Sequence, residues 1–131
     1  MNIESLVVTD APQVYAYTST EIVKQKILEG QHFLKVVDDQ DQFLGFITAK
    51  DIFRHQYQLA VDCLSDKPAL RTRHTIYEAT QILIQRQEDV APVFSEDNIF
   101  LGAVHKDSLM EYLLRYSIHL ENQLKTYQQT L

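Results

Sequence analysis

An internal repeat constrains the fold of this chain more than any other feature of its 131 residues. A Phe-Leu-Gly segment ends at Gly45 and recurs with its glycine at Gly102, 57 positions further on. The same offset, without a gap, pairs four more identities: Thr18 with Thr75, Glu21 with Glu78, Ile27 with Ile84, and Val36 with Val93. Self-similarity at a fixed distance is typical of two copies of one structural unit. We therefore expect the same elements to occur twice.

Each copy begins with a predicted short strand, at residues 14–17 and 70–73, followed by a predicted helix. Thr18 and Thr75 each precede an acidic residue by three positions, which is the capping-box pattern of a helix start. Helical spacing then predicts which side chains face the core. They are Ile22, Val23 and Ile27 in the first copy, and Ile76, Ala79, Thr80 and Leu83 in the second.

Two strands and a further helix complete each copy. The predicted strands are residues 33–37 and 43–48 in the first copy and 90–94 and 99–104 in the second, with acidic turns between them. The fold class is therefore α/β (α+β), with two β-α-β-β-α repeats. We expect one repeat over residues 1–58, the other over 59–116, and a helical extension over 117–131. Residues 57–66 are not rich in Gly or Ser, so both repeats are expected to form one module.

Several classes of chemistry are excluded by composition. The chain has three scattered glycines, so no glycine-rich phosphate loop is present, and Cys63 is its single cysteine. The five histidines, His32, His55, His74, His105 and His119, show no metal-ligand spacing. No catalytic arrangement of a nucleophile with a base is apparent. We expect neither an enzyme nor a metal site, and no required cofactor.

Charge and hydropathy narrow the possible partners. Twelve basic against eighteen acidic residues give a formal charge of −6, which disfavours nucleic-acid binding. Arg71 and Arg73, with His74 beside them, form a local basic cluster that is either a solvated strand face or a phosphate site. No stretch approaches the roughly 18 apolar residues of a membrane span, and Glu4 stands where a signal peptide would be basic. We expect a soluble, cytoplasmic protein.

Two segments in each copy resemble the cystathionine β-synthase (CBS) domain. They are residues 35–38 followed by 43–51, and residues 91–94 followed by 100–104, which resemble a "PVVD" strand and an "LvGivT" strand leading into a helix. The resemblance covers about residues 3–114. It implies a pseudo-twofold module with two sheets packed face to face. It also implies clefts for an adenosine-containing ligand (AMP, ADP, ATP or S-adenosylmethionine), a homodimer, and a regulatory action on a partner protein.

The resemblance also implies which residues bind the ligand. Thr48 and Asp51 match the family's Ser/Thr-x-x-Asp contact to phosphate and ribose, and His32, Phe33 and Leu34 match the adenine pocket. The chemistry is reasonable, because a Thr hydroxyl can donate to phosphate, Lys50 can add charge, and a carboxylate can accept two ribose hydroxyls. The same Thr-x-x-Asp spacing is also a helix-capping arrangement that needs no ligand. Both interpretations remain open.

The second copy departs from this pattern. His105 and Ser108 stand at the positions of Thr48 and Asp51, so we expect its cleft to be empty or altered. A second or phosphate site there would use His105 and Ser108 with Arg71 and Arg73. In the first copy, Lys35 replaces the proline of the family's "PVVD" strand.

The C-terminal helix is predicted to run from Lys106 to the end, about 39 Å. The residues Leu113, Ser117, Leu120, Leu124, Tyr127 and Leu131 follow alternating steps of four and three, as in a coiled-coil seam. Dimerisation or partner docking is one interpretation, and packing along the chain's own module is the other. Two functional hypotheses follow: an adenine-nucleotide sensor that acts on a partner protein, or a ligand-free dimeric scaffold of the same fold.

Overall fold

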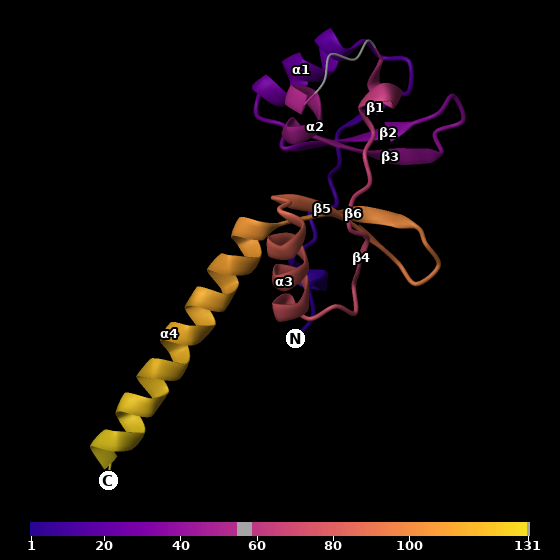
Figure 1. Ribbon diagram of the computed structural model, residues 1–131. Coiled ribbons are helices and arrows are strands. Elements are labelled where there is room, and N and C mark those ends of the chain that lie inside the picture. Colours follow the sequence, from indigo (N-terminus) through magenta and orange to yellow (C-terminus); the bar gives the residue numbers. More distant parts are fainter. Residues whose placement is uncertain (55–58, 131) are drawn as a thin grey trace.

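The structure is a computed structural model that describes residues 1–54 and 59–130, and it contains the predicted order of elements twice (Figure 1). The first copy consists of β1 (Gln13–Tyr15), α1 (Thr20–Leu28), β2 (Phe33–Val37), β3 (Phe43–Thr48) and α2 (Ala49–Arg54). The second consists of β4 (Leu70–Arg71), α3 (Ile76–Arg86), β5 (Val90–Phe94), β6 (Phe100–His105) and α4 (Lys106–Thr130). The α/β fold class and the β-α-β-β-α order are confirmed. The predicted boundary after residue 58 and the last seam residue, Leu131, lie outside the described residues.

Each copy forms a three-stranded sheet, in the orders β1-β2-β3 and β4-β5-β6. The first strand of each sheet runs parallel to the second, and the third runs antiparallel to it. The registers match at the predicted offset, since Phe33 pairs with Thr48 and Val90 pairs with His105. In both hairpins the pairing register also shifts between the last two residues of the leading strand, at Val36/Val37 in β2 and at Val93/Phe94 in β5. The repeat is therefore preserved in backbone detail.

The turns between the paired strands show how different residues perform the same role. In the first copy the Asp38 carboxylate accepts the N–H of Gln42 at 2.9 Å, and in the second the Ser95 hydroxyl accepts the N–H of Ile99 at 3.1 Å. A residue with positive φ follows in each turn, Asp41 at 61° or Asn98 at 64°. Side-chain acceptance of backbone N–H groups is why Asp and Ser are favoured in such turns.

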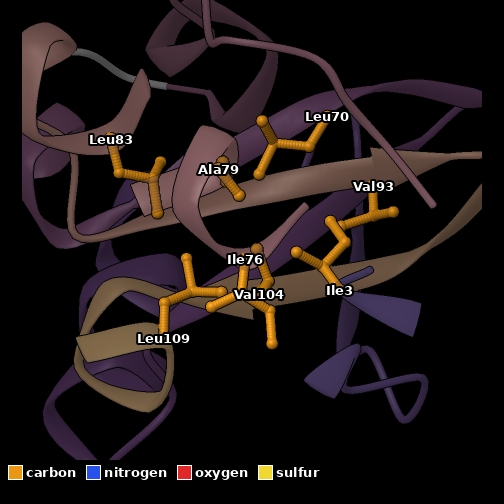
Figure 2. Close-up of a cluster of buried hydrophobic side chains, with 9 residues drawn as sticks. Ile3, Leu70, Ile76, Ala79, Leu83, Val93, Val104 and Leu109 are labelled. Carbon is orange, nitrogen blue, oxygen red and sulfur yellow. The ribbon is translucent and has the colours of Figure 1, made fainter. Parts of the chain in front are cut away.

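Each copy has its own apolar core, and each core is completed by a segment that precedes the other copy. We call residues 1–8 the N-terminal arm and residues 59–67 the inter-repeat arm. Ile3 of the N-terminal arm is fully buried in the core of the second copy (Figure 2). Ala60 and Cys63 of the inter-repeat arm are buried in the core of the first copy. The arms are thus exchanged, which ties the two repeats into one module.

The crossing of these arms explains the repeated Phe-Leu-Gly segment. A Cβ atom at Gly102 would overlap the backbone carbonyl of Val8 in the N-terminal arm, which pairs with Ala103. At the equivalent Gly45, a Cβ atom would lie 2.6 Å from a methyl carbon of Leu64 in the inter-repeat arm. Another segment passes directly over the strand at both positions; Gly102 faces backbone, which leaves no room for a Cβ atom, whereas Gly45 faces the end of a flexible side chain.

The two sheets meet face to face through aromatic and small side chains (Figure 1). Phe33 and Phe46 of the first copy are buried against Val90 and Ala103 of the second. At one end of this interface Phe43 stacks on Phe100, with ring centroids 4.7 Å apart and planes 13° apart. These two residues are 57 positions apart, so equivalent side chains meet across the pseudo-twofold axis.

Local predictions were partly wrong in the first copy. The capping box is present at Thr75 and Glu78, but α1 is capped by Ser19 without a side-chain hydrogen bond. Thr18 is unavailable as a cap because its hydroxyl accepts the N–H of Tyr15 and its carbonyl accepts the N–H of Ala60. The arm therefore moves the helix start by one residue. Ile22, predicted to face the core, is 47% exposed.

Helix α4 is continuous from Lys106 and projects away from the module (Figure 1). Leu109 is fully buried, and Tyr112 and Leu113 pack against the second core. From residue 114 to residue 129 every side chain is exposed. Of the two interpretations of this helix, packing along its own module therefore holds only as far as Leu113 and is wrong beyond it. Within residues 1–54 and 59–130, no helix combines the length and the hydropathy required to span a bilayer.

Candidate functional site

A cleft of about 630 Å³ lies between the repeats, where β2 and β5 begin and β3 and β6 end. Both copies supply its walls with equivalent segments, namely the residues before β2 and β5 and the residues that start α2 and α4. The lining residues are Ile27, Gly30, Gln31, His32, Thr48, Ala49, Lys50, Glu88, Asp89, Val90, His105, Asp107 and Ser108.

Five of the predicted site residues line this cleft: His32, Thr48, Lys50, His105 and Ser108. The sequence assigned the first three to a site of the first repeat and the last two to a separate site of the second. The structure brings all five to the same cleft, because the sheet registers place Thr48 and His105 at matching strand ends.

Phe33 and Leu34, predicted to line an adenine pocket, do not line the cleft. Phe33 is 4% exposed and stacks on Phe46 with ring centroids 5.0 Å apart, in the interface between the sheets. Leu34 is fully buried in the first core. Adjacent residues of a strand point to opposite faces of the sheet, so Phe33 enters the interface between the sheets and Leu34 enters the first core.

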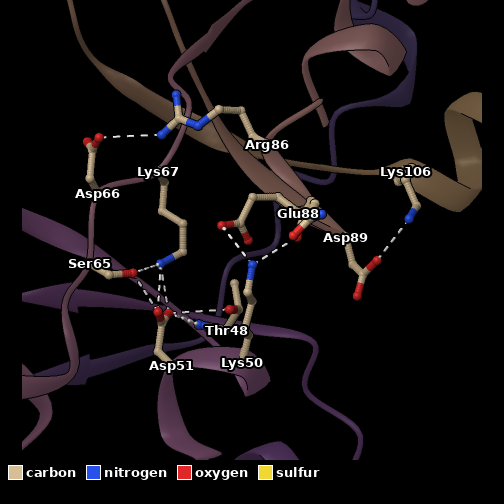
Figure 3. Close-up of polar contacts among 11 residues, drawn as sticks. Thr48, Lys50, Asp51, Ser65, Asp66, Lys67, Arg86, Glu88, Asp89 and Lys106 are labelled. Carbon is tan, nitrogen blue, oxygen red and sulfur yellow. Dashed lines mark hydrogen bonds and ion pairs between the residues drawn. The ribbon is translucent and has the colours of Figure 1, made fainter. Parts of the chain in front are cut away.

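Asp51 is also away from the cleft lining, and its carboxylate is surrounded by donors (Figure 3). It accepts the N–H of Thr48 at 2.9 Å, the hydroxyl of Ser65 at 2.5 Å, and the ammonium of Lys67 at 2.8 Å. The hydroxyl of Thr48 donates to it at 3.3 Å. One half of the capping arrangement is therefore present, since the Asp51 carboxylate accepts the N–H of Thr48, and the inter-repeat arm supplies the counterion.

Lys50 is the one Lys or Arg among the lining residues, and its acidic neighbour is Glu88. Its ammonium lies 3.6 Å from the Glu88 carboxylate and donates to the carbonyl of Gln87 at 2.9 Å, which joins the two repeats across the cleft (Figure 3). Asp89 and Asp107 also line the cleft, and Lys106 pairs with Asp89 at 3.1 Å. The cleft thus contains more carboxylates than ammonium groups.

His32 and His105 meet edge to face across the cleft, with ring centroids 5.3 Å apart. Burial lowers the pKa of His105 below its usual value, the neighbouring His32 lowers it further, and Asp107 partly opposes both effects. The neutral imidazole is therefore favoured at His105, where it can donate or accept a hydrogen bond.

Known proteins share this architecture. The CBS-domain family model matches residues 3–57, and no curated protein matches the chain by sequence. The structure resembles solved CBS-domain structures. One is the protein CBSX2 in complex with AMP (TM-score 0.75, 14% identity, 88% of this chain and 98% of the other). Another is the CBS-domain protein TA0289 of unknown function from Thermoplasma acidophilum (TM-score 0.75, 19% identity, 91% and 72%).

The chain has the fold of a CBS-domain pair. A third similar structure is the cytosolic domain of the Mg²⁺ channel MgtE in complex with ATP. Its TM-score is 0.66 at 15% identity, over 85% of this chain and 48% of that domain. The CBS pair therefore spans about half of that larger structure.

The basic cluster of the CBS pair does not contribute to the cleft. Arg73 makes two hydrogen bonds with Glu96, at 2.8 and 2.7 Å. Arg71 donates to the carbonyl of Ser95 at 2.7 Å and lies over the ring of Phe94. Both arginines hold the turn before β6, so the alternative of a solvated, structural role is favoured over a phosphate site.

Several cleft residues of the CBS pair were missed by sequence reasoning, chiefly Glu88, Asp89 and Asp107. The offset of 57 was a usable signal, because it carries Gln31 to Glu88 and His32 to Asp89. The family resemblance implies only residues that match its motifs, and these acidic residues match none of them. Among the residues that the structure describes, no group of three or more His, Cys, Asp or Glu side chains is arranged to hold a metal ion.

Cys63 of the CBS pair is buried and unsuited to nucleophilic chemistry. Burial raises the pKa of its thiol, and the nearby Asp51 raises it further. A thiol held in its protonated form is a poor nucleophile.

Proposed function

We propose that this CBS pair is a regulatory module that binds an adenosine-containing ligand in the cleft between its repeats and signals to a partner protein. The observation that carries the proposal is the construction of the cleft, because matching segments of both repeats line one space of about 630 Å³. That volume lies in the usual range for small-molecule sites, roughly 300–1,000 Å³. Solved structures of the same fold contain AMP or ATP, as their descriptions state.

The lining supplies the groups that such a ligand needs. Ile27 and Val90 offer apolar surface for a base, and His32 and His105 offer ring faces and hydrogen bonds. The Thr48 hydroxyl and the Lys50 ammonium are the candidate partners of a phosphate. Lys50 would exchange its contact with Glu88, a 3.6 Å ion pair in which the Lys50 side chain is 39% exposed and the Glu88 side chain 12%.

Asp51 contributes indirectly in this proposal. Its two oxygens already accept from Lys67 and Ser65, so it can accept ribose hydroxyls only if the inter-repeat arm releases it. We propose that its role in the unliganded state is to hold Thr48 at the edge of the cleft.

Regulation follows from the shared walls. A ligand that touches both repeats binds one relative placement of the repeats more tightly than others and shifts the population toward it. The direct link across the cleft that such a ligand would replace is Lys50 to Glu88 and Gln87. The altered placement would then be presented to the partner protein.

The test is a thermal-shift and calorimetry series with AMP, ADP, ATP, S-adenosylmethionine and NAD, with GMP as a control ligand. A ligand at 100 times its Kd stabilises the native state by about 2.7 kcal/mol, which is several degrees for a domain of this size. We expect Thr48→Val and Lys50→Met to reduce the shift. The matched control is Lys26→Met, on α1 and outside the cleft lining, and it should leave the shift unchanged.

A ligand-free dimeric scaffold is the second candidate function. It is favoured by the acidic lining, since Glu88, Asp89 and Asp107 oppose a phosphate, and by the occupied carboxylate of Asp51. The two functions are distinguished by the same series, because a scaffold shows no shift with any ligand. A shift that persists in Thr48→Val and Lys50→Met would instead show that the ligand binds elsewhere.

A further inference from the structure

No residue of α4 from 114 to 129 is buried, so packing on the module does not account for the apolar residues in this projecting part. Residues 114–129 are all exposed and extend the helix by about 24 Å beyond the last contact with the second core. Helices of this length are marginal in water unless an apolar face is packed. The segment nevertheless carries large apolar residues, including Leu120 at 46% and Leu124 at 57% exposure.

Part of the apolar surface of α4 forms one stripe, which Leu114 and Tyr116 flank, while Ile118 lies off it. Met110, Leu113, Ser117, Leu120, Leu124 and Tyr127 alternate steps of three and four, and we call these six residues the α4 stripe. This is the spacing with which two helices pack side by side in a coiled coil. Leu113 is half-buried against the module, so the stripe begins at the module and runs outward.

The charges of α4 lie largely off the stripe and balance one another. The helix has three basic and three acidic residues, Lys106, Arg115 and Lys125 against Asp107, Glu111 and Glu121. Arg115 pairs with Glu111 of the same helix at 2.6 Å. Of the positions that flank the stripe in the projecting part, only Glu121 carries a charge. A neutral, apolar stripe repels no second copy of itself and offers no charge to select an oppositely charged partner.

We infer that the α4 stripe pairs with the same stripe of a second copy of this chain, forming a homodimer through a short two-helix coiled coil. A groove of about 290 Å³ at the base of α4 extends the contact, because Leu113 and Tyr116 line it together with Met1, Thr75, Ile76, Tyr77 and Tyr112. Leu113 belongs to both the stripe and the groove, so the two form one continuous surface. The interface is separate from the cleft, so it does not depend on ligand binding.

The test compares two double variants of the full chain by sedimentation equilibrium and light scattering. Leu120→Glu with Leu124→Glu puts two charges into the stripe, and Asn122→Glu with Gln129→Glu puts the same two charges on the opposite face of α4. Both pairs are exposed in the single chain, so neither variant disturbs the module core. We expect a dimer for the wild type and the second variant, and for the first variant an association weakened by a factor of roughly 100 or more, that is, a Kd raised by that factor.

A gain of association provides an independent readout. Ser117→Leu replaces the polar residue of the stripe, and we expect it to tighten the dimer about tenfold, while Asn122→Leu on the opposite face leaves it unchanged. A wild-type chain that remains monomeric at protein concentrations up to about 0.5 mM would overturn the inference. So would a dimer that survives Leu120→Glu with Leu124→Glu, since another surface would then be responsible.

Discussion

The ammonium of Lys67 lies 2.8 Å from the carboxylate of Asp51, and the two side chains are only 5% and 3% exposed. Lys67 belongs to the inter-repeat arm, and Asp51 belongs to the first turn of α2 beside Thr48. The pair therefore links the segment that joins the repeats to the edge of the cleft. Its position makes the arm, and not only the two sheets, part of the frame that holds the site.

Removal of one partner of this pair should be costly. We expect Lys67→Met to lower the free energy of unfolding by about 3–5 kcal/mol, because a buried carboxylate loses its counterion. Replacing both partners, as in Asp51→Leu with Lys67→Met, should recover part of that loss, because no unpaired charge remains. Urea unfolding of the single and double variants measures both values.

The exposed ion pair between Arg86 and Asp66 is the matched control for this experiment. Its side chains are 48% and 94% exposed at 3.4 Å, so Arg86→Met should change stability by no more than about 1 kcal/mol. If Lys67→Met costs as little as Arg86→Met, the Asp51 carboxylate is not held in the buried state that the structure shows.

The two arm-crossing glycines should respond differently to alanine. At Gly102 the added Cβ meets the backbone of Val8, which cannot move without breaking its pairing with Ala103. At Gly45 it meets the end of the Leu64 side chain, which can change rotamer. We expect Gly102→Ala to destabilise by about 3 kcal/mol or more and Gly45→Ala by about 1 kcal/mol. Thermal unfolding of both variants decides, and equal losses would contradict the exchanged-arm arrangement.

The acidic lining of the cleft should limit its affinity for phosphate. Glu88 is almost fully buried and lies 3.6 Å from Lys50, so Glu88→Gln removes a carboxylate that competes with the ligand for that cation. We expect AMP to bind about 3–10 times more tightly to Glu88→Gln than to the wild type, as measured by calorimetry. Glu29→Gln, at the exposed end of α1, is the control. Unchanged or weaker AMP binding in Glu88→Gln would show that the ligand phosphate does not approach Lys50.

Most of the fold was predictable because the repeat supplied two independent copies of each signal. Strands β2, β3 and β5 have the predicted bounds, and β6 differs by one residue. The exchanged arms could not be predicted, because the segments around Ile3 and Cys63 carry no motif. Nothing in the sequence shows that Ile3 packs in the second core or that Cys63 packs in the first. Thr18 illustrates the result, since its capping pattern is intact but its carbonyl accepts the N–H of Ala60 in the arm and its hydroxyl accepts the N–H of Tyr15 in β1.

The site was less predictable than the fold, for a physical reason. Thr48 was identified from the Ser/Thr-x-x-Asp motif and His105 from its equivalent position in the second copy, and both line the cleft because the registers bring these strand ends together. Asp51 was assigned a ligand role because its spacing suits both a cap and a ribose contact, and the sequence does not show that Lys67 approaches it. The acidic residues Glu88 and Asp107 carry no motif, and their importance comes only from their place in the fold, because Glu88 pairs with Lys50 across the cleft and Asp107 lies beside His105 in the lining.

The His105 imidazole should make the stability of the module depend on pH. Its pKa is lowered in the folded state by burial and by His32, with Asp107 opposing, so the unfolded chain binds a proton more readily than the folded chain. Stability from this source is complete above the ordinary value of 6.5 and is lost as the pH falls below it, toward the lowered pKa. We expect His105→Gln to reduce the loss of stability between pH 7 and pH 5, as measured by urea unfolding at each pH. His119→Gln, on the exposed part of α4, should retain the wild-type dependence. A His105→Gln curve parallel to that of the wild type would show that the imidazole is not desolvated in the cleft.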